Sequence, residues 1–210
     1  MSKNLLIVSA FAFSIATVVV MIAENDIPKF QQDLFDGLHF SAPVIEDIAD
    51  DDVRLSPTVR YQSDTHGYIL RYPSSWSLEN ATHDFDGDIL ADPAERAVIT
   101  ISETTSEALV GTGVVSMVAD SISSSLKLDP AFHLETLKKL QWKGHETIFT
   151  NGSRHLGSKI LHTQEYTIFR PNRSGVLTIS ITTEEKTEML YQRVIESVLN
   201  SLEVSLENSL

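Results

Sequence analysis

The sequence predicts an α+β fold, in which an antiparallel β-sheet is flanked by helices and preceded by one N-terminal transmembrane helix. Three observations lead to this fold class. Several segments between residues 59 and 182 alternate apolar and polar residues, as strands with one buried face do. Two later stretches repeat apolar residues at helical spacing. Near the N-terminus, nineteen consecutive residues carry no charge.

The uncharged segment runs from Leu5 to Ala23, and as a helix it is about 28 Å long, close to the ~30 Å hydrocarbon core of a bilayer. A cleaved signal peptide is the alternative, with Ser14-Ile15-Ala16 as its cleavage site. Cleavage there leaves a strongly apolar stretch at the new terminus, so an uncleaved anchor is the preferred interpretation.

Lys3 precedes this segment, whereas Glu24 and Asp26 follow it. The positive-inside rule then places the N-terminus in the cytoplasm and the rest of the chain outside it. We therefore expect a single-pass membrane protein with an extracytoplasmic C-terminal domain, and a cleaved signal would export the same domain.

Residues 24–56 are acidic and show no sustained apolar period, which is typical of a flexible tether. Residues 57–204 are long enough for one domain that needs neither metal nor disulfide, and residues 205–210 are expected to fray. The chain has no Cys, which excludes disulfides, thiolate metal sites and Cys nucleophiles. Its net charge of −13 argues against nucleic acid as a partner.

Within the domain, we expect a hairpin from residues 59–62 and 68–72, a strand over 97–102, and a second hairpin from 160–168 and 176–181. A helix is expected after Gly113, ending at Asp129-Pro130, and a closing helix carries the stripe Tyr191, Ile195, Val198 and Leu202. Thr182 and Glu185 have the spacing of a capping box for that helix. For residues 133–142, leucine spacing favours a helix and the Trp142-Lys143-Gly144 turn favours a hairpin.

From about Val59 to Val204 the chain resembles the PsbP family, named for an extrinsic subunit of photosystem II. The resemblance lies in GYILRYPSSW, LKLDPAF, WKGHE, EYTIFR, GVLTISIT and VIESVLNSLEV. It implies an α-β-α sandwich and a role as an accessory or assembly factor of a membrane complex. The quoted motifs contain packing and turn residues rather than catalytic groups, so the resemblance speaks mainly to the fold.

One acidic stretch, from Asp84 to Glu95, matches a calcium-loop template. Its acids occupy the first, third, fifth, ninth and twelfth places of the template, and they are Asp84, Asp86, Asp88, Asp92 and Glu95. The glycine of the sixth place is replaced by Ile89, and no helix is expected on either side. An acidic surface loop is therefore the preferred interpretation, with calcium as the only cofactor that the pattern allows.

No nucleophile elbow, zinc-binding histidine pair or phosphate-binding loop occurs in the sequence. Ser153 and His155 are neighbours in a stretch interpreted as a polar hairpin loop. The expected function is a non-enzymatic, membrane-anchored accessory module that binds a partner protein. A calcium-binding structural or sensing domain and a hydrolase with a site assembled from distant residues are the alternatives.

Overall fold

The computed structural model describes residues 57–80, 87–106, 109, 113–156, 159–170 and 175–204. The predicted transmembrane helix, the tether and the C-terminal tail lie outside these residues. Ten strands and two α-helices are described. They are β1 Thr58–Ser63, β2 Tyr68–Pro73, β3 Ser77–Glu79, β4 Gly87–Ala91, β5 Ala97–Thr105, α4 Val114–Leu128, β6 Phe132–Trp142, β7 His145–Leu156, β8 Lys159–Arg170, β9 Gly175–Glu184, α5 Glu188–Ser201 and β10 Glu203–Val204.

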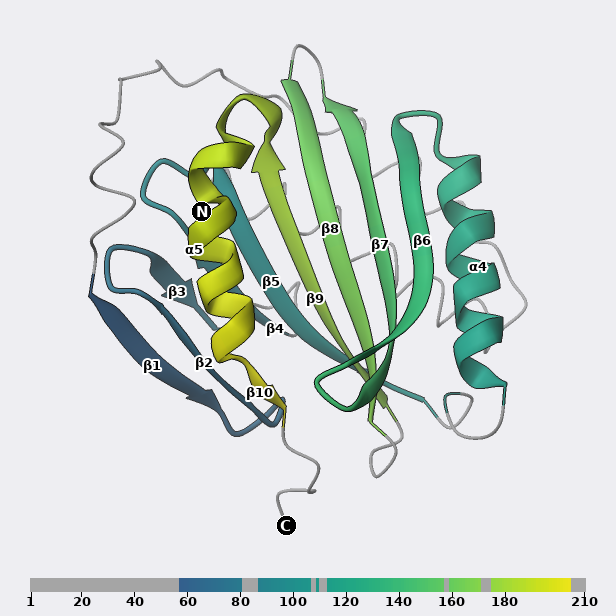
Figure 1. Cartoon of the computed structure of the whole chain (residues 1–210), viewed down its shortest axis with the longest axis horizontal. Coiled ribbons are helices and arrows are strands. Elements are labelled where there is room, and N and C mark those ends of the chain that lie inside the picture. Colours follow the sequence, from purple (N-terminus) through teal and green to yellow (C-terminus); the bar gives the residue numbers. More distant parts are fainter. Residues whose placement is uncertain are drawn as a thin grey trace.

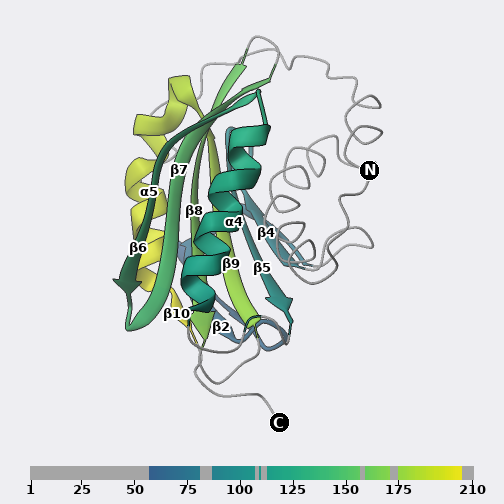
Figure 2. The same ribbon diagram turned by 90° about the vertical axis from the view of Figure 1, so that its right-hand side faces the viewer.

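The strands form two antiparallel sheets. The large sheet has the order β3-β4-β5-β9-β8-β7-β6, and the small one has the order β1-β2-β10. Figure 1 shows α5 and the small sheet in front of the large sheet, and Figure 2 shows α4 on the opposite side of the large sheet from α5. The domain is thus a helix–sheet–helix sandwich, which confirms the predicted fold class for the described residues.

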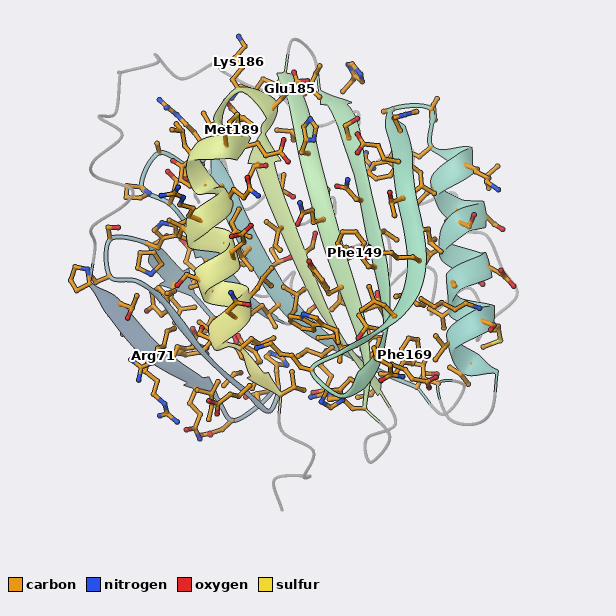
Figure 3. All side chains as sticks on the ribbon, viewed as in Figure 1. Arg71, Phe149, Phe169, Glu185, Lys186 and Met189 are labelled. Carbon is orange, nitrogen blue, oxygen red and sulfur yellow. The ribbon has the colours of Figure 1, made fainter. Side chains whose placement is uncertain are left out.

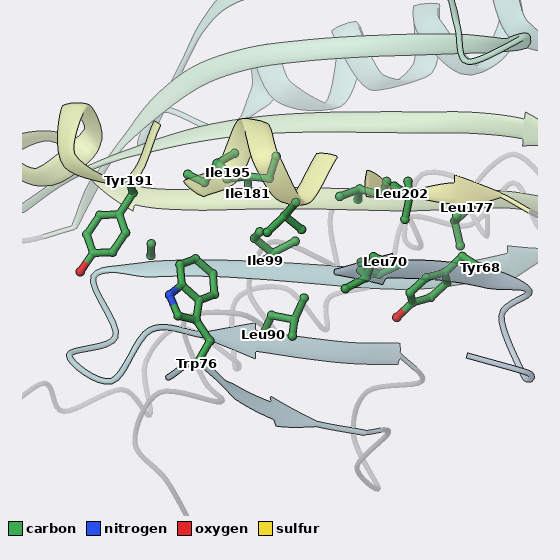
Figure 4. Packing of buried hydrophobic residues seen from close by; sticks show 14 of the residues in the cluster. Tyr68, Leu70, Trp76, Leu90, Ile99, Leu177, Ile181, Tyr191, Ile195 and Leu202 are labelled. Carbon is green, nitrogen blue, oxygen red and sulfur yellow. The ribbon is translucent and has the colours of Figure 1, made fainter. Parts of the chain in front are cut away.

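The front layer encloses the main hydrophobic core. Leu70 and Trp76 from the hairpin region, Ile99 from β5 and Ile195 from α5 are all buried in it (Figure 4). Each such side chain contributes about 1.5–3 kcal/mol when fully buried. The helical stripe predicted from Tyr191 onward therefore faces this core.

A second core lies between α4 and the back of the sheet. Val118, Ile122 and Leu126 of α4 pack there with Ile148 of β7. Gly113, with φ 88°, immediately precedes this helix, and the helix ends before Pro130 as predicted.

Residues 133–142 form strand β6, which settles the alternative that the sequence leaves open. A bulge between Leu134 and Thr136 shifts the register against β7, so that Leu134 and Leu137 both pack on the α4 side. Leucines three apart thus share one face of a strand. Gly152 lies at this bulge, where an added Cβ would meet the His133 carbonyl oxygen at 2.5 Å.

The β6–β7 turn has positive φ at both Lys143 and Gly144, as a tight hairpin turn requires.

Two predictions from the sequence are wrong. Ser153 and His155 lie inside β7, because that strand pairs with β8 from Thr147 to Leu156, and not in a hairpin loop. Thr182 does not cap α5, because it pairs with β5 inside β9, and a short 3₁₀ turn, Glu185–Thr187, precedes the helix.

Candidate functional site

The front face of the large sheet changes character from one side to the other. Six residues lie opposite one another across it, in the order Lys138, Phe149, Tyr166, Ile179, Ile101 and Asp88. The last three are buried, whereas Phe149 and Tyr166 are half-buried and Lys138 is exposed. Helix α5 and the small sheet lie over β4, β5 and β9, and leave part of the front of β6, β7 and β8 without a covering helix in Figure 1. At the end of β8 near Arg170, Ile168 on the same face is buried in the main core.

An aromatic row, defined as Trp142, Tyr166 and Phe149, lies at the border of the main core, against which Trp142 and Tyr166 pack. The Tyr166 ring lies 5.0 Å from the Trp142 ring and 4.9 Å from the Phe149 ring, centroid to centroid. The Lys138 ammonium lies 5.1 Å from the centre of the Phe149 ring. Figure 3 shows Phe149 on this open face. Aromatic side chains with a flanking cation are typical anchors in protein interfaces.

Lys143 fixes this surface to the neighbouring helix. Its ammonium donates hydrogen bonds to the carbonyl oxygens of Asn200, at 2.8 Å, and Leu202, at 2.6 Å, where α5 ends. The same ammonium lies 5.5 Å from the centre of the Trp142 ring. Burial lowers the pKa of Lys143, and the Glu203 carboxylate partly offsets that effect. The β6–β7 hairpin and the C-terminus of α5 are therefore held together.

Of the predicted calcium ligands, Asp88 lies in the buried strand β4. Its carboxylate accepts hydrogen bonds from the hydroxyl groups of Tyr61, at 3.1 Å, and Tyr68. Burial and the hydrogen bond to Asp88 raise the pKa of Tyr68 above its ordinary value. The interpretation of residues 84–95 as a surface loop is therefore wrong for Asp88, which joins the small sheet to the large one.

Asp92 is also buried, in the turn after β4. Its carboxylate accepts hydrogen bonds from the Tyr191 hydroxyl at 2.7 Å and from the backbone N–H groups of Ala97, at 2.8 Å, and Ala94, at 3.0 Å. Burial, followed by the hydrogen bond to Asp92, raises the pKa of Tyr191. Asp92 thus closes the β4–β5 turn and fastens α5 to it.

Asp84 and Asp86 lie outside the described residues, so the calcium loop stays a prediction. Glu95 is exposed in the β4–β5 turn, where partial burial and the carboxylates of Asp92 and Glu79 raise its pKa. Among residues that the structure describes, no three His, Cys, Asp or Glu side chains are grouped so that they could hold a metal ion.

Glu165 is the buried carboxyl of the sheet's back face. It lies between Thr150 of β7 and Ser180 of β9, and its side chain is 5% exposed. Burial raises the pKa of Glu165 to about 8, so this carboxyl group is mostly protonated at neutral pH. A neutral carboxyl group donates as well as accepts hydrogen bonds.

The comparisons with known proteins concern the fold. No family model and no curated protein matches the chain. The solution structure of PsbP from the cyanobacterium Synechocystis is similar with a TM-score of 0.54 and 15% identity, over 78% of this chain and 100% of that one. The crystal structure of LpqN, involved in cell envelope biogenesis of Mycobacterium tuberculosis, is similar with a TM-score of 0.50 and 16% identity, over 71% of this chain and 91% of that one.

The chain therefore has an α+β sandwich, and this sandwich is PsbP-like. The resemblance stated from the sequence is confirmed at the level of the fold. Within the described part of the chain, neither helix is long and apolar enough to span a bilayer. The predicted membrane segment, Leu5 to Ala23, precedes that part.

Sequence reasoning missed the aromatic row. Trp142 belongs to a predicted turn and Tyr166 to a predicted strand, and the two are 24 positions apart in the sequence. Only the register of β7 against both neighbours brings Phe149 beside Tyr166 and Lys138. The available signal was that three consecutive stretches that can form strands each carry one large aromatic residue. These residues are Trp142, Phe149 and Tyr166.

Proposed function

We propose that this protein is a non-enzymatic accessory module, anchored in a membrane, that presents its PsbP-like domain to a partner protein of a membrane complex on the extracytoplasmic side. The observation that carries the proposal is the aromatic row, which lies on the part of the large sheet that α5 leaves uncovered. Large half-buried rings on a rigid sheet bind protein surfaces with little loss of conformational entropy.

Two further points support this function. The fold matches that of cyanobacterial PsbP over the whole length of that chain, and the resemblance to the PsbP family implies an accessory role. The buried carboxylates of Asp88 and Asp92 are occupied by hydrogen bonds that join parts of the fold. Their role is therefore in the architecture of the described domain.

Photo-crosslinking of the full chain in its own membranes tests the proposal. A photoreactive phenylalanine analogue replaces Phe149, and the matched control replaces Met189, which is 87% exposed on α5. We expect a membrane-protein adduct from position 149 that disappears in a Tyr166→Ala background, and none from position 189. Adducts of equal yield at both positions, or adducts unaffected by Tyr166→Ala, contradict the proposed surface.

The anchor has a separate test. A segment held by hydrophobic insertion stays in the membrane through carbonate and high-salt washing, because its attachment is not ionic. We expect the chain to remain in the washed membranes. A soluble product that begins near Thr17 identifies the segment as a cleaved signal instead.

A further inference from the structure

The turn between β6 and β7 contains a lysine at a position where the backbone disfavours one. Lys143 has φ 51° and Gly144 has φ 84°, and the flanking residues Trp142 and His145 lie opposite each other in the two strands. A two-residue hairpin turn with positive φ at both positions prefers Asn-Gly or Asp-Gly, because longer side chains are strained in the left-handed region. A strained residue of this kind points to a role for its side chain.

The Lys143 ammonium supplies a charge that the end of α5 lacks. The last carbonyl groups of a helix have no partner within the helix, and the last turn of α5 contains no basic residue. Lys143 precedes Asn200 by 57 positions, and its ammonium donates hydrogen bonds to the carbonyl oxygens of Asn200 and Leu202. A positive charge at this end of a helix is favourable. The tip of the hairpin is thus joined to the point where α5 passes into β10.

The same end of α5 is also held by the small sheet. The backbone N–H of Arg71 donates a hydrogen bond of 2.8 Å to the Ser201 hydroxyl, and β10 pairs with β2 directly after the helix. A lysine side chain is flexible, and a fixed pair of acceptors restricts where its ammonium lies. The two carbonyl groups that bind Lys143 are therefore a fixed point for its charge.

We propose that Lys143 is a positioning residue of the aromatic row, which keeps the Trp142 ring in one orientation for the partner. The Lys143 ammonium lies over the Trp142 ring, 5.5 Å from its centre, and the Tyr166 ring lies 5.0 Å from the same centre. A cation held in place attracts the electron-rich face of the indole. A ring that is already ordered loses less conformational entropy on binding. This inference rests on the proposed function and names a residue that tunes its affinity.

The fluorescence of Trp142 tests the positioning directly. The chain has two tryptophans, so a Trp76→Phe background leaves Trp142 as the only one. In the full chain in detergent, K143N should raise the amplitude of the fast, nanosecond part of the anisotropy decay at least about twofold, because the ring loses its cation. K143R keeps the charge and the donors, so it should restore the natural decay.

The stability of the same variants separates positioning from a merely structural role. Asn suits the left-handed turn position better than Lys, whereas the end of α5 loses its cation, so the two effects oppose each other. The urea midpoint of K143N should therefore stay close to that of the control K139N, which removes a charge that contacts Ser116 of α4. K139N should leave the Trp142 decay unchanged. Crosslinking from position 149 in native membranes should fall severalfold in K143N and persist in K143R and K139N.

Three results overturn the inference and leave the proposed function intact, provided that adducts still form at position 149 of the natural chain. They are an unchanged Trp142 decay in K143N, a changed decay that K143R does not restore, and crosslinking that is as strong in K143N as in the natural chain. Absence of adducts from position 149 in the natural chain overturns the proposed function, and the binding role of Lys143 with it.

Discussion

The two halves of the large sheet's front face are built from the same strand pattern but differ in what lies over them. The covered half, β4, β5 and β9, places Ile101 and Ile179 beneath α5 and the small sheet. The open half, β6, β7 and β8, places Phe149 and Tyr166 in the same cross-strand row, where both rings stay half-buried and Tyr166 packs against the border of the main core. Burial along this row thus follows from the covering layer rather than from the strands. The covered end of the row stabilises the fold, and the proposed function assigns the half-buried end to a partner.

The largest loss of stability is expected at the contact that holds α5 to the β4–β5 turn. Asp92→Ala leaves the Tyr191 hydroxyl and two backbone N–H groups without their acceptor, so it should lower the free energy of unfolding by about 3–5 kcal/mol. Urea unfolding of the full chain in detergent, followed by the fluorescence of Trp76 beside Tyr191, measures this change.

The control for this variant is Glu95→Ala, which removes the same charge from an exposed position in the same turn. Its effect should stay below about 1 kcal/mol. Equal losses from the two variants would mean that Asp92 does not hold the covering layer.

Matched truncations along one row compare the halves directly. Ile179→Ala should cost about 2–5 kcal/mol, because Ile179 is 1% exposed and its removal leaves a cavity. Phe149→Ala, two strands away on the open half, should cost about 1 kcal/mol or less. Both are measured by urea unfolding of the full chain, and a larger loss from Phe149→Ala would contradict the assignment of the two halves.

An effect that appears only as the pH rises belongs to the back face. The folded pKa of Glu165, about 8, lies above its value of 4.5 in the unfolded chain, so the stability that this group contributes is complete below pH 4.5 and is lost as the pH rises through 8. Gln mimics the protonated form. Glu165→Gln should therefore leave stability nearly unchanged at pH 4.5 and raise it by roughly 4 kcal/mol near pH 8, because each pKa unit is worth about 1.4 kcal/mol.

Glu146→Gln, at an exposed position of β7, is the control and should change stability little at either pH. Thermal unfolding at pH 5 and pH 8 separates the two variants. A gain from Glu165→Gln that is the same at both values excludes titration of this carboxyl group as the cause.

Calcium is expected to have the smallest effect. The carboxylates of Asp88 and Asp92 already accept hydrogen bonds from three tyrosines, which a metal ion must displace. Millimolar calcium should therefore shift the melting temperature no more than magnesium does. A calcium-specific rise of several degrees would restore the predicted calcium loop.

The sequence predicted the elements whose patterns are local. The hairpin of residues 160–168 and 176–181 and the stripe from Tyr191 to Leu202 are visible because one face of each is buried by its own domain. At Leu134 and Leu137 the pattern misled, since a bulge puts residues three apart on one face of a strand. A bulge depends on how two strands pair, so the apolar pattern of either sequence alone does not reveal it.

The acidic stretch from Asp84 to Glu95 shows that a local pattern also fails to predict a site when the partners of its residues are distant in the sequence. Asp88 and Asp92 match a loop template by spacing, yet their hydrogen-bond partners Tyr61, Tyr68 and Tyr191 come from β1, β2 and α5. Partners 20 to 99 positions away in the chain decide whether a carboxylate binds a cation or joins two elements. The aromatic row was missed for the same reason.

Cysteine accessibility in the native membrane tests the central claim, that the open half is occupied by a partner, most directly. The chain has no Cys, so Phe149→Cys and Met189→Cys each introduce a single thiol. The account predicts that a polar maleimide labels both variants after purification, and that in intact membranes position 149 is protected while position 189 still reacts. Equal labelling of both positions in the membrane would contradict it.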